Sequence, residues 1–437
     1  MAKFPRLLAL PLAAIFVVAA CGGGSTSSGG TGGSGGTTGA TITVTSLWGG
    51  SEQESFQKVL DAFKAKTGNT ATYDAQRTDY ATVLQSKITS GAPPDVAIMP
   101  GLGFLRQFAR SKGIKSIKEL GLDPASLEAN YPAGILDSGK VDGELYGIMV
   151  KFNSKSTFWY RPDTLTAAGA TPPKSWDDLK SLITTLQGKG TATPLALGAK
   201  DSWTLTDWFE EVYLRQNGPD AYKKLFSPDG DWTDASVSKA LSTMKEVITD
   251  KNVPGGITGA LGVAFTDGIA QAFGTNPTAA LYYEGGFVGG IATGQTNKDL
   301  KIGTSIDWFG FPTFGGAGDT AAEIGGDEIA ALTTKPGVKE FIQFMTTADA
   351  GSTWAKTGAI ISPVKAVGAE NYPNDLAKKE AAQVAGASAV VYDGSDTLPA
   401  GAPDMGAMLQ KVIQGQDVTG LLTDFNTGVK KAWTDEK

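Results

Sequence analysis

Few side chains in this sequence are suited to catalysis or to metal binding. The 437 residues contain no histidine and one cysteine. A chain without histidine has no Ser-His-Asp or Cys-His catalytic centre, and a lone cysteine builds no intramolecular disulfide, Cys₄ zinc site or iron–sulfur cluster. We therefore predict no metal, no cofactor and no catalytic residue, which leaves aromatic faces, carboxylates and amides to act on a ligand.

Aromatic and polar residues follow the predicted strands near the start of the chain. Trp48 and Glu52 come after the strand predicted at 41–45, and the glycine-rich segment 100–103 comes after the third predicted strand. In open parallel sheets, ligands bind beyond the carboxyl ends of the strands, so we expect both segments at one edge. Trp48 then supplies a flat apolar face and Glu52 a hydrogen-bond acceptor beside it.

Strands and helices alternate over residues 41–113. Further strands are predicted at 70–73 and at 95–99, the latter introduced by Pro93 and Pro94. Ser51 and Glu54 form a capping-box pattern for the first helix, which we expect to end at Gly68. This alternation predicts an α/β structure in which parallel strands are joined by right-handed crossovers.

The amino terminus has the pattern of a lipoprotein signal. Lys3 and Arg6 precede an apolar run over 7–20, which is too short to span a bilayer as a helix. The run ends in VAAC at 18–21, which resembles the bacterial lipobox. We predict a signal peptide at 1–20, lipidation of Cys21 and a flexible Gly/Ser/Thr tether up to residue 40. The alternative for Cys21 is a buried free cysteine.

The overall composition indicates a folded, acidic protein. Asp and Glu number 45 against 38 Lys and Arg, for a net charge of −7, and 41% of the residues are hydrophobic. The chain has no basic run that would neutralise phosphates, so we expect no nucleic-acid partner. Its length corresponds to two or three domains at ~150 residues each, and we expect a monomer.

Nine short blocks along the chain resemble the extracellular solute-binding proteins of ABC transporters. The similarity is to the carbohydrate-binding family (family 1) that includes maltose-binding protein. The blocks are WGGSE (48–52), FKAKTG (63–68), SGAPPDVA (90–97), LYGI (145–148), WYR (159–161), PKSWDDL (173–179), DWFE (207–210), YEGGF (283–287) and GGDE (325–328). Together the nine blocks span nearly the whole chain that follows the lipobox.

The resemblance implies a two-lobed periplasmic-binding-protein fold of type II, with a ligand cleft between the lobes and three crossings of the chain. By position, the crossings fall near Val150, Asp327 and Ala366. Lobe one is then 41–149 plus 327–365, and lobe two is 150–326 plus 366–437. The resemblance also implies hinge closure over a ligand and delivery to the transmembrane permease subunits of an ABC importer.

A carbohydrate ligand, a disaccharide or an oligosaccharide, is the one that the resemblance implies. Aromatic platforms suit the C–H faces of a sugar, and polar side chains suit its hydroxyls. The candidate contacts are Trp48, Glu52, Arg77, Asp79, Lys151, Asn153, Trp203, Asp207, Glu284, Phe287, Asp327, Ser395 and Asp396. Trp203 and Asp207 are placed in a loop before a helix that starts at Trp208. Each candidate has an alternative as a core, capping, turn or solvated residue.

Three other functions remain open on the sequence. An acidic cleft also suits a non-sugar solute such as a polyamine or a peptide. A surface glycoside hydrolase would need two facing carboxylates, which the 45 acids do not exclude. The pair Tyr282-Tyr283 resembles the tyrosines that bind ferric iron in related receptors, although neighbouring strand residues point to opposite faces.

Overall fold

The computed structural model describes residues 39–132, 135–190 and 193–436. The predicted signal peptide, Cys21 and the tether as far as residue 38 lie outside the described residues. Within the described part of the chain, no helix combines the length and the apolar character that crossing a bilayer requires.

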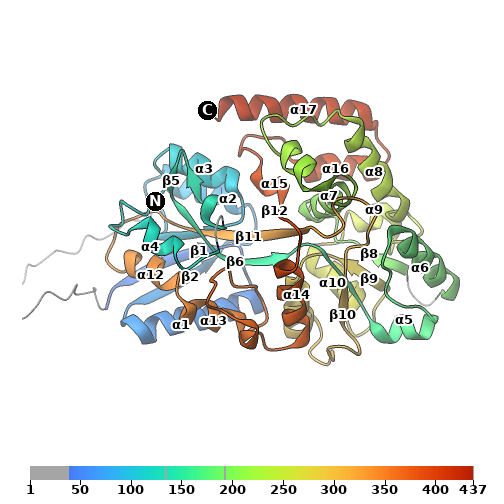
Figure 1. The fold of residues 1–437 in the computed structure, drawn as a ribbon, viewed down its shortest axis with the longest axis horizontal. Helices are drawn as coiled ribbons and strands as arrows, with labels where there is room; N and C mark the ends of the chain where they lie inside the picture. The colour runs from blue at the N-terminus through green and yellow to red at the C-terminus, as the bar shows by residue number, and fades with distance from the viewer. Residues whose placement is uncertain (1–38, 133–134, 191–192, 437) are drawn as a thin grey trace, which may run out of the picture. The chain divides into compact units, whose positions relative to one another are not determined.

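Six strands form the first sheet, and its first three strands are parallel as predicted. The order is β12 (Val390–Tyr392), β11 (Ala322–Ala331), β3 (Val96–Met99), β1 (Thr41–Ser46) and β2 (Thr70–Ala75), and β6 (Gly147–Ser154) also pairs with β11. β1 is parallel to β2 and β3, whereas β11 is antiparallel to β3 and β6 and parallel to β12. Figure 1 shows β11 and β6 running side by side through the middle of the described structure.

Helices from two distant parts of the chain cover this sheet. They are α1 (Ser51–Thr67), α2 (Tyr80–Thr89), α3 (Leu102–Arg110), α4 (Pro124–Glu128), α12 (Val338–Met345) and α13 (Ala348–Ala355), with a 3₁₀ turn at Ile135–Asp137 and a small hairpin of β4 (Lys140–Val141) and β5 (Glu144–Leu145). The first helix ends at Gly68, whose φ of 74° is left-handed, as predicted. Its start differs from the prediction: Gly50 is the N-cap and Ser51 is already helical, so no side-chain capping box forms.

The second sheet has four strands in the order β10 (Asp307–Gly310), β7 (Thr157–Tyr160), β9 (Ala279–Tyr283) and β8 (Thr193–Ala196). β7 is antiparallel to both β10 and β9, and β8 is parallel to β9. The helices that pack with it are α5 (Pro162–Ala168), α6 (Trp176–Lys189), α7 (Trp203–Leu225), α8 (Ala235–Val247), α9 (Gly256–Ala260), α10 (Phe265–Phe273) and α11 (Phe287–Ile291), which continues as a π-helical turn at Ala292–Thr296.

The last part of the chain returns between the two sheets. A 3₁₀ turn at Ala369–Asn371 leads to α14 (Asp375–Ala385), then to β12 in the first sheet, and finally to α15 (Gly394–Thr397), α16 (Met405–Ile413) and α17 (Val418–Asp435). β12 lies within 366–437, the segment expected in the second lobe, yet it pairs with β11 of the first sheet. α16 and α17 pack into the core of the second sheet through residues such as Leu409 and Phe425.

Each sheet has its own hydrophobic core on both faces, which gives the fold two lobes. Val96 and Ile98 of β3 point into one cluster, and Ala97 and Met99 point into another on the opposite face. Strands buried on both faces read as continuous apolar runs, and β3 has this pattern. The second sheet is covered in the same way, since its strand residues also divide between two clusters.

Candidate functional site

A pocket of about 370 Å³ opens where elements of both lobes meet. Its walls come from the N-terminus of α3, the N-terminus of α7 and the segment from α15 to α16, all labelled in Figure 1. Three predicted site residues line it, namely Trp203, Ser395 and Asp396. The remaining lining residues are Gly101, Gly103, Phe104, Ser202, Thr206, Leu398, Pro399, Ala400, Ala402, Pro403, Asp404, Met405 and Gly406.

Trp203 presents an aromatic face to this pocket. The side chain is 37% exposed, which is unusual for a tryptophan in this protein. Its ring lies 5.0 Å from that of Phe265 and 6.1 Å from that of Phe287, so two predicted site residues belong to one aromatic cluster. Trp203 is the first residue of α7, and the prediction that it precedes a helix starting at Trp208 is wrong.

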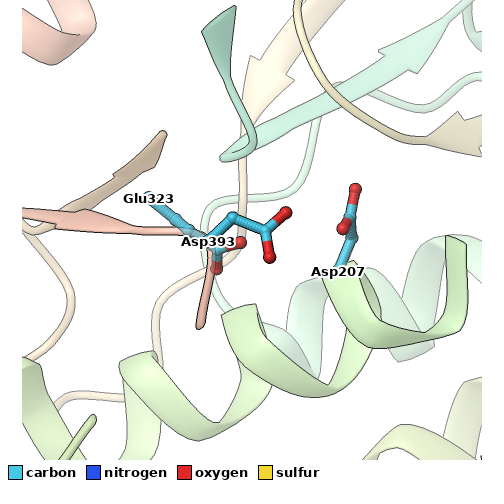
Figure 2. A group of neighbouring side chains, drawn as sticks. All are labelled: Asp207, Glu323 and Asp393. Carbon is cyan, nitrogen blue, oxygen red and sulfur yellow. The ribbon is translucent and has the colours of Figure 1, made fainter. Parts of the chain in front are cut away.

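A buried ionic cluster lies behind Trp203. The Nζ atom of Lys155 is 4.9 Å from the centre of the Trp203 ring and 5.5 Å from that of Phe287. The same ammonium lies 2.6 Å from Asp207 Oδ2 and 3.3 Å from Asp393 Oδ2. Asp207 was predicted to lie in a loop but is buried in the second turn of α7. Its carboxylate converges with those of Asp393 and Glu323, as Figure 2 shows.

Burial dominates the electrostatics of this cluster. Burial raises the pKa of Asp207 to about 6, although the Lys155 ammonium acts in the opposite direction. Burial and the neighbouring Asp207 raise the pKa of Glu284, another predicted site residue, well above its ordinary value. Glu284 is 1% exposed, so it cannot contact a ligand in this conformation without movement of the groups around it.

Glu210 holds the pocket wall that carries Ser395 and Asp396. Its carboxylate accepts hydrogen bonds from the Gly394 amide at 2.5 Å and the Ser395 amide at 3.1 Å. It also accepts from the Tyr222 hydroxyl at 2.6 Å. Asp393 caps the same short helix, since its Oδ1 accepts from the Asp396 amide at 3.3 Å, and it also accepts from Ser395 Oγ at 2.9 Å. Buried carboxylates therefore hold the backbone that carries Ser395 and Asp396.

A second ionic group joins four of the predicted residues. Lys151 Nζ lies 3.0 Å from Asp327 Oδ2, 3.9 Å from Glu52 Oε1 and 4.8 Å from the centre of the Trp48 ring. Burial raises the pKa of Glu52, and the Lys151 ammonium opposes this effect. These four predicted residues are therefore neighbours in the structure, although they come from three separate segments.

Trp48 does not lie open as the accessible platform that we expected. It is 2% exposed and belongs to the core of the first lobe. Phe56 and Trp354 pack edge-on against its ring, each at 5.1 Å, and the Lys151 ammonium covers one face. Because protein groups already surround the ring, Trp48 acts as a packing residue in this conformation.

The other predicted residues lie apart from the pocket. Asn153 is buried and its amide donates to Glu380 Oε1 at 3.2 Å and to the Ala359 carbonyl at 3.3 Å. Arg77 is exposed and lies against Gly49, where a Cβ would come within 2.7 Å of Arg77 Cδ. Asp79 is exposed at the N-cap position of α2, with a left-handed φ of 50° and no capping hydrogen bond.

The tyrosine pair considered for ferric iron has other partners. Tyr282 and Tyr283 point to opposite faces of β9, as predicted, but both are buried. The Tyr282 hydroxyl donates to the Phe265 carbonyl at 3.1 Å, and the Tyr283 hydroxyl donates to the Asp207 carbonyl at 3.0 Å. Two hydroxyls that face apart and are already bonded do not form a metal site.

Sequence reasoning missed several residues of this region. Lys155 directly follows strand β6, which contains Lys151. Phe104 directly follows Gly103 in the glycine-rich segment that was identified. Asp393 is two residues before Ser395, so the loop was identified but its most buried acid was not. For Glu323, the sequence offered no sign of a role in the site beyond its position in a strand.

Comparisons with known proteins agree with this architecture. Residues 49–352 match the family model described as bacterial extracellular solute-binding protein. The chain is 29% identical over 400 residues to the osmoprotective compounds-binding protein GgtB of Synechocystis sp., covering 90% of this chain and 92% of the relative. It is 28% identical to the alpha-glucosides-binding periplasmic protein AglE of Rhizobium meliloti, covering 91% and 88%.

Solved structures share the fold at low sequence identity. The bacterial solute receptor AcbH, described as having an exclusive preference for β-D-galactopyranose, superposes with a TM-score of 0.76 at 21% identity. The match covers 91% of this chain and 98% of that structure. The predicted α/β, two-lobed fold is thereby confirmed.

Proposed function

Because the chain belongs to the bacterial extracellular solute-binding protein family, we propose that it is the substrate-binding component of an ABC importer and that it captures a carbohydrate. The pocket beside Trp203 carries this proposal. A partly exposed indole supplies a platform for the C–H face of a sugar ring. Ser395, Thr206 and Asp396 beside it offer hydroxyl and carboxylate groups to sugar hydroxyls. A relative named for α-glucosides supports the same class of ligand.

A disaccharide or a short oligosaccharide is the ligand that we propose. The pocket volume of about 370 Å³ falls in the range that small-molecule sites occupy. Phe104 also lines the pocket and adds a second aromatic side chain, from the first lobe. Two aromatic groups on separate lobes suit a ligand that both lobes contact at once.

A cationic solute such as a polyamine or a basic peptide is the second candidate. The charged side chains that line the pocket are Asp396 and Asp404, both acidic. Asp404 caps α16 by accepting from the Ala407 amide at 2.9 Å, which occupies one of its oxygens. Asp396 is therefore the acid with which a cation would pair, and an anionic ligand is disfavoured in either case.

We propose binding without chemical conversion. A glycoside hydrolase needs an acid and a nucleophile or base placed on both sides of a glycosidic bond. Of the two acids on the pocket wall, Asp404 is committed to its helix cap. Incubating the purified protein with oligosaccharides and assaying reducing ends tests this point, and release of reducing sugar would favour the hydrolase instead.

We also propose that lipidated Cys21 anchors the protein to the outer face of the cytoplasmic membrane. Removal of the signal at 1–20 would leave the cysteine as the first residue, and the Gly/Ser/Thr tether would separate it from the lobes. The permease subunits of the importer would then meet a monomeric receptor at the membrane. Metabolic labelling with a radioactive fatty acid tests the anchor, since Cys21→Ala should abolish incorporation.

The lobe boundaries near Val150, Asp327 and Ala366 stay part of this proposal, as do the ligand roles of the predicted residues. Trp203, Ser395 and Asp396 have the strongest support, because they line the pocket. Phe287, Asp207 and Glu284 would act behind them. Glu52, Lys151 and Asp327, with Trp48, would form the facing wall once the lobes separate.

A thermal-shift screen tests the ligand class directly. The purified protein is heated with mono-, di- and oligosaccharides and, in parallel, with polyamines and basic peptides. A ligand at a hundred times its Kd stabilises the folded state by about 2.7 kcal/mol, which raises the Tm measurably. Stabilisation by saccharides alone supports the proposal, whereas stabilisation by polyamines alone identifies the second candidate.

A further inference from the structure

Glu323 is a buried carboxylate without any donor. The side chain is 0% exposed, and neither Oε1 nor Oε2 has a hydrogen-bond partner in the part of the chain that the structure describes. Its neighbours on α7 differ in this respect. Glu211 pairs with Arg215 Nε at 2.8 Å and also accepts from Ser156 Oγ, and Glu210 accepts from Tyr222 and two amides. A buried carboxylate left without a partner is costly, so a further positive group is expected here.

Two other carboxylates converge on the same point. Oxygen atoms of Asp207, Glu323 and Asp393 all lie within 4.8 Å of one another. Figure 2 shows Asp207 rising from α7 toward Asp393, with Glu323 reaching in beside it from the strand. Asp207 also shares a side-chain hydrogen bond with Glu284, whereas both Glu323 oxygens have no partner among the described residues. Calcium–oxygen distances of about 2.3–2.6 Å allow oxygens up to about 5 Å apart to share one ion.

The charges of the group leave room for a divalent ion. Lys155 pairs with Asp207 and Asp393 through one oxygen of each and is the cation that contacts this trio. In their ionised forms, three carboxylates and one ammonium carry a net charge of −2. Burial and the neighbouring carboxylates raise the pKa of Glu323 well above its ordinary value, so a bound cation would take the place of a proton on this side chain. Arg215 is engaged with Glu211 and with carbonyls at Gly318 and Ala321, and therefore does not neutralise the trio. Glu284, behind Asp207, adds no positive charge.

We propose that Asp207, Glu323 and Asp393 bind a hard divalent cation, calcium in preference to magnesium. The ligands are all carboxylate oxygens, which calcium and magnesium prefer and which do not suit zinc or copper. Three carboxylates from separate elements make an irregular site, and calcium tolerates irregular coordination where magnesium requires near-octahedral geometry. Lys155 would remain beside the bound ion, paired with Asp207 Oδ2.

The site would connect parts of the fold that form the pocket. Glu323 belongs to β11, Asp393 follows β12 and caps α15, and Asp207 belongs to α7 below Trp203. An ion bound there would hold the Ser395–Asp396 wall against the helix that carries the aromatic platform. The bound ion would then make the pocket wall more rigid, whichever solute the pocket accepts.

Metal binding by the intact protein tests the proposal. The protein is stripped with EDTA, exchanged into metal-free buffer at neutral pH and titrated with calcium chloride by calorimetry. Terbium(III) luminescence, sensitised by aromatic rings such as Tyr283, gives a second readout. We expect about one ion per chain with a Kd of about 1 mM or tighter, and weaker binding of magnesium.

Two substitutions on the same strand provide a matched pair. Glu323→Gln removes a charged ligand and should weaken calcium binding by at least about tenfold. Glu328→Gln changes a glutamate of β11 that is equally buried and has one unpartnered oxygen, but that contacts Ser138 in the first lobe. It should leave calcium binding unchanged. Equal binding by the parent and Glu323→Gln would overturn the proposal.

The unaltered protein gives an answer even if Glu323→Gln fails to fold. In equilibrium dialysis against calcium at about 5 mM, elemental analysis should find about one calcium per chain in excess on the protein side, and no excess would refute the site. The sugar thermal-shift screen is repeated in EDTA, so that a failure of sugar binding and a failure of metal binding are recognised separately.

Discussion

Two lysines, Lys151 within β6 and Lys155 directly after it, each lie over an aromatic ring. Lys151 lies over Trp48 and Lys155 lies over Trp203, and each ammonium is also paired with carboxylates. Only Trp203 keeps part of its ring accessible. At the scale of single residues, exposure rather than residue type therefore distinguishes a binding platform from a packing residue.

Replacing the two tryptophans should give opposite results. Trp203→Ala should weaken saccharide binding by about tenfold or more and leave the Tm of the unliganded protein nearly unchanged, because the removed ring is partly in solvent. Trp48→Ala should instead destabilise the fold by about 3–5 kcal/mol, as expected for a large residue removed from a core. Calorimetric ligand titration and urea unfolding measure the two effects.

Ile302→Ala is the control for Trp203→Ala, since Ile302 is also an exposed apolar residue but does not line the pocket. If Trp203→Ala binds as tightly as this control, the pocket is not the ligand site.

Glu380 should make stability depend on pH. It accepts from the Ser154 amide at 2.9 Å, and burial raises its pKa to about 7. The folded state then holds more protons than the unfolded state between about pH 4.5 and pH 7, so stability falls as the pH rises through that range. Glu380→Gln keeps an acceptor without the charge. The difference in unfolding free energy between Glu380→Gln and the parent should therefore be roughly 1–3 kcal/mol more favourable to the variant at pH 8 than at pH 4.5. Urea unfolding at the two pH values measures this difference.

Exposed Glu54 gives the control for this measurement. Glu54→Gln should shift stability equally at both pH values. An equal shift for Glu380→Gln as well would mean that folding does not change the pKa of Glu380.

At the scale of single helices, the N-cap residue contributes to stability. α17 is 18 residues long and its N-cap Asp417 accepts from the amides of Thr419 and Gly420 at 3.2 and 3.0 Å. Asp417→Ala should cost about 1 kcal/mol of unfolding free energy, because two backbone donors lose their acceptor. Asp424→Ala, in the exposed middle of the same helix, should cost nothing measurable. Equal losses in chemical denaturation would show that the cap contributes nothing.

The same scale shows how far sequence analysis reached. The first helix with its end at Gly68 and the early parallel strands were predicted, because a glycine stop and short strand-like runs mark them locally. The start of α7 was not predicted. Residues 204–215 of α7 are all buried, including Glu210 and Glu211, so the helix has no polar face and no readable period there.

The candidate site was predicted only in part, because many of its contacts join residues that are far apart in the chain. The loop with Ser395 and Asp396 and the aromatic Trp203 were identified through family resemblance. The contacts among Lys155, Asp207 and Asp393 join positions far apart in the chain, and neither charge nor spacing signals them locally. The burial of Trp48 likewise depends on Trp354, a residue from the other end of the first lobe.

At the scale of the whole molecule, the contact between α1 and the turn after α11 allows closure to be tested. A Cβ built at Gly294 lies 3.2 Å from Ser51 Cβ, close to the separation found in disulfides. The pair Ser51→Cys and Gly294→Cys, in a Cys21→Ala background, should oxidise and fix the lobes in this arrangement. Ligand association should then be slowed or abolished and should recover on reduction, as followed by stopped-flow fluorescence.

Each single-cysteine variant is the control for the disulfide and should bind ligand at the parent rate under oxidising conditions. If the cross-linked protein exchanges ligand as fast as its reduced form, ligand entry does not require the lobes to separate.

The topology of the first sheet has a consequence for how the chain acquires its structure. β11 pairs with β3 across more than two hundred residues, as in the contact of Ala97 with Ala330, and β12 joins it only at residues 390–392. A ribosome delivers the amino-terminal strands long before these partners exist. β3 has a bare edge until residues 322–331 have emerged, and β11 in turn lacks β12 until residues 390–392 follow, so completion of this lobe is a late event in biosynthesis.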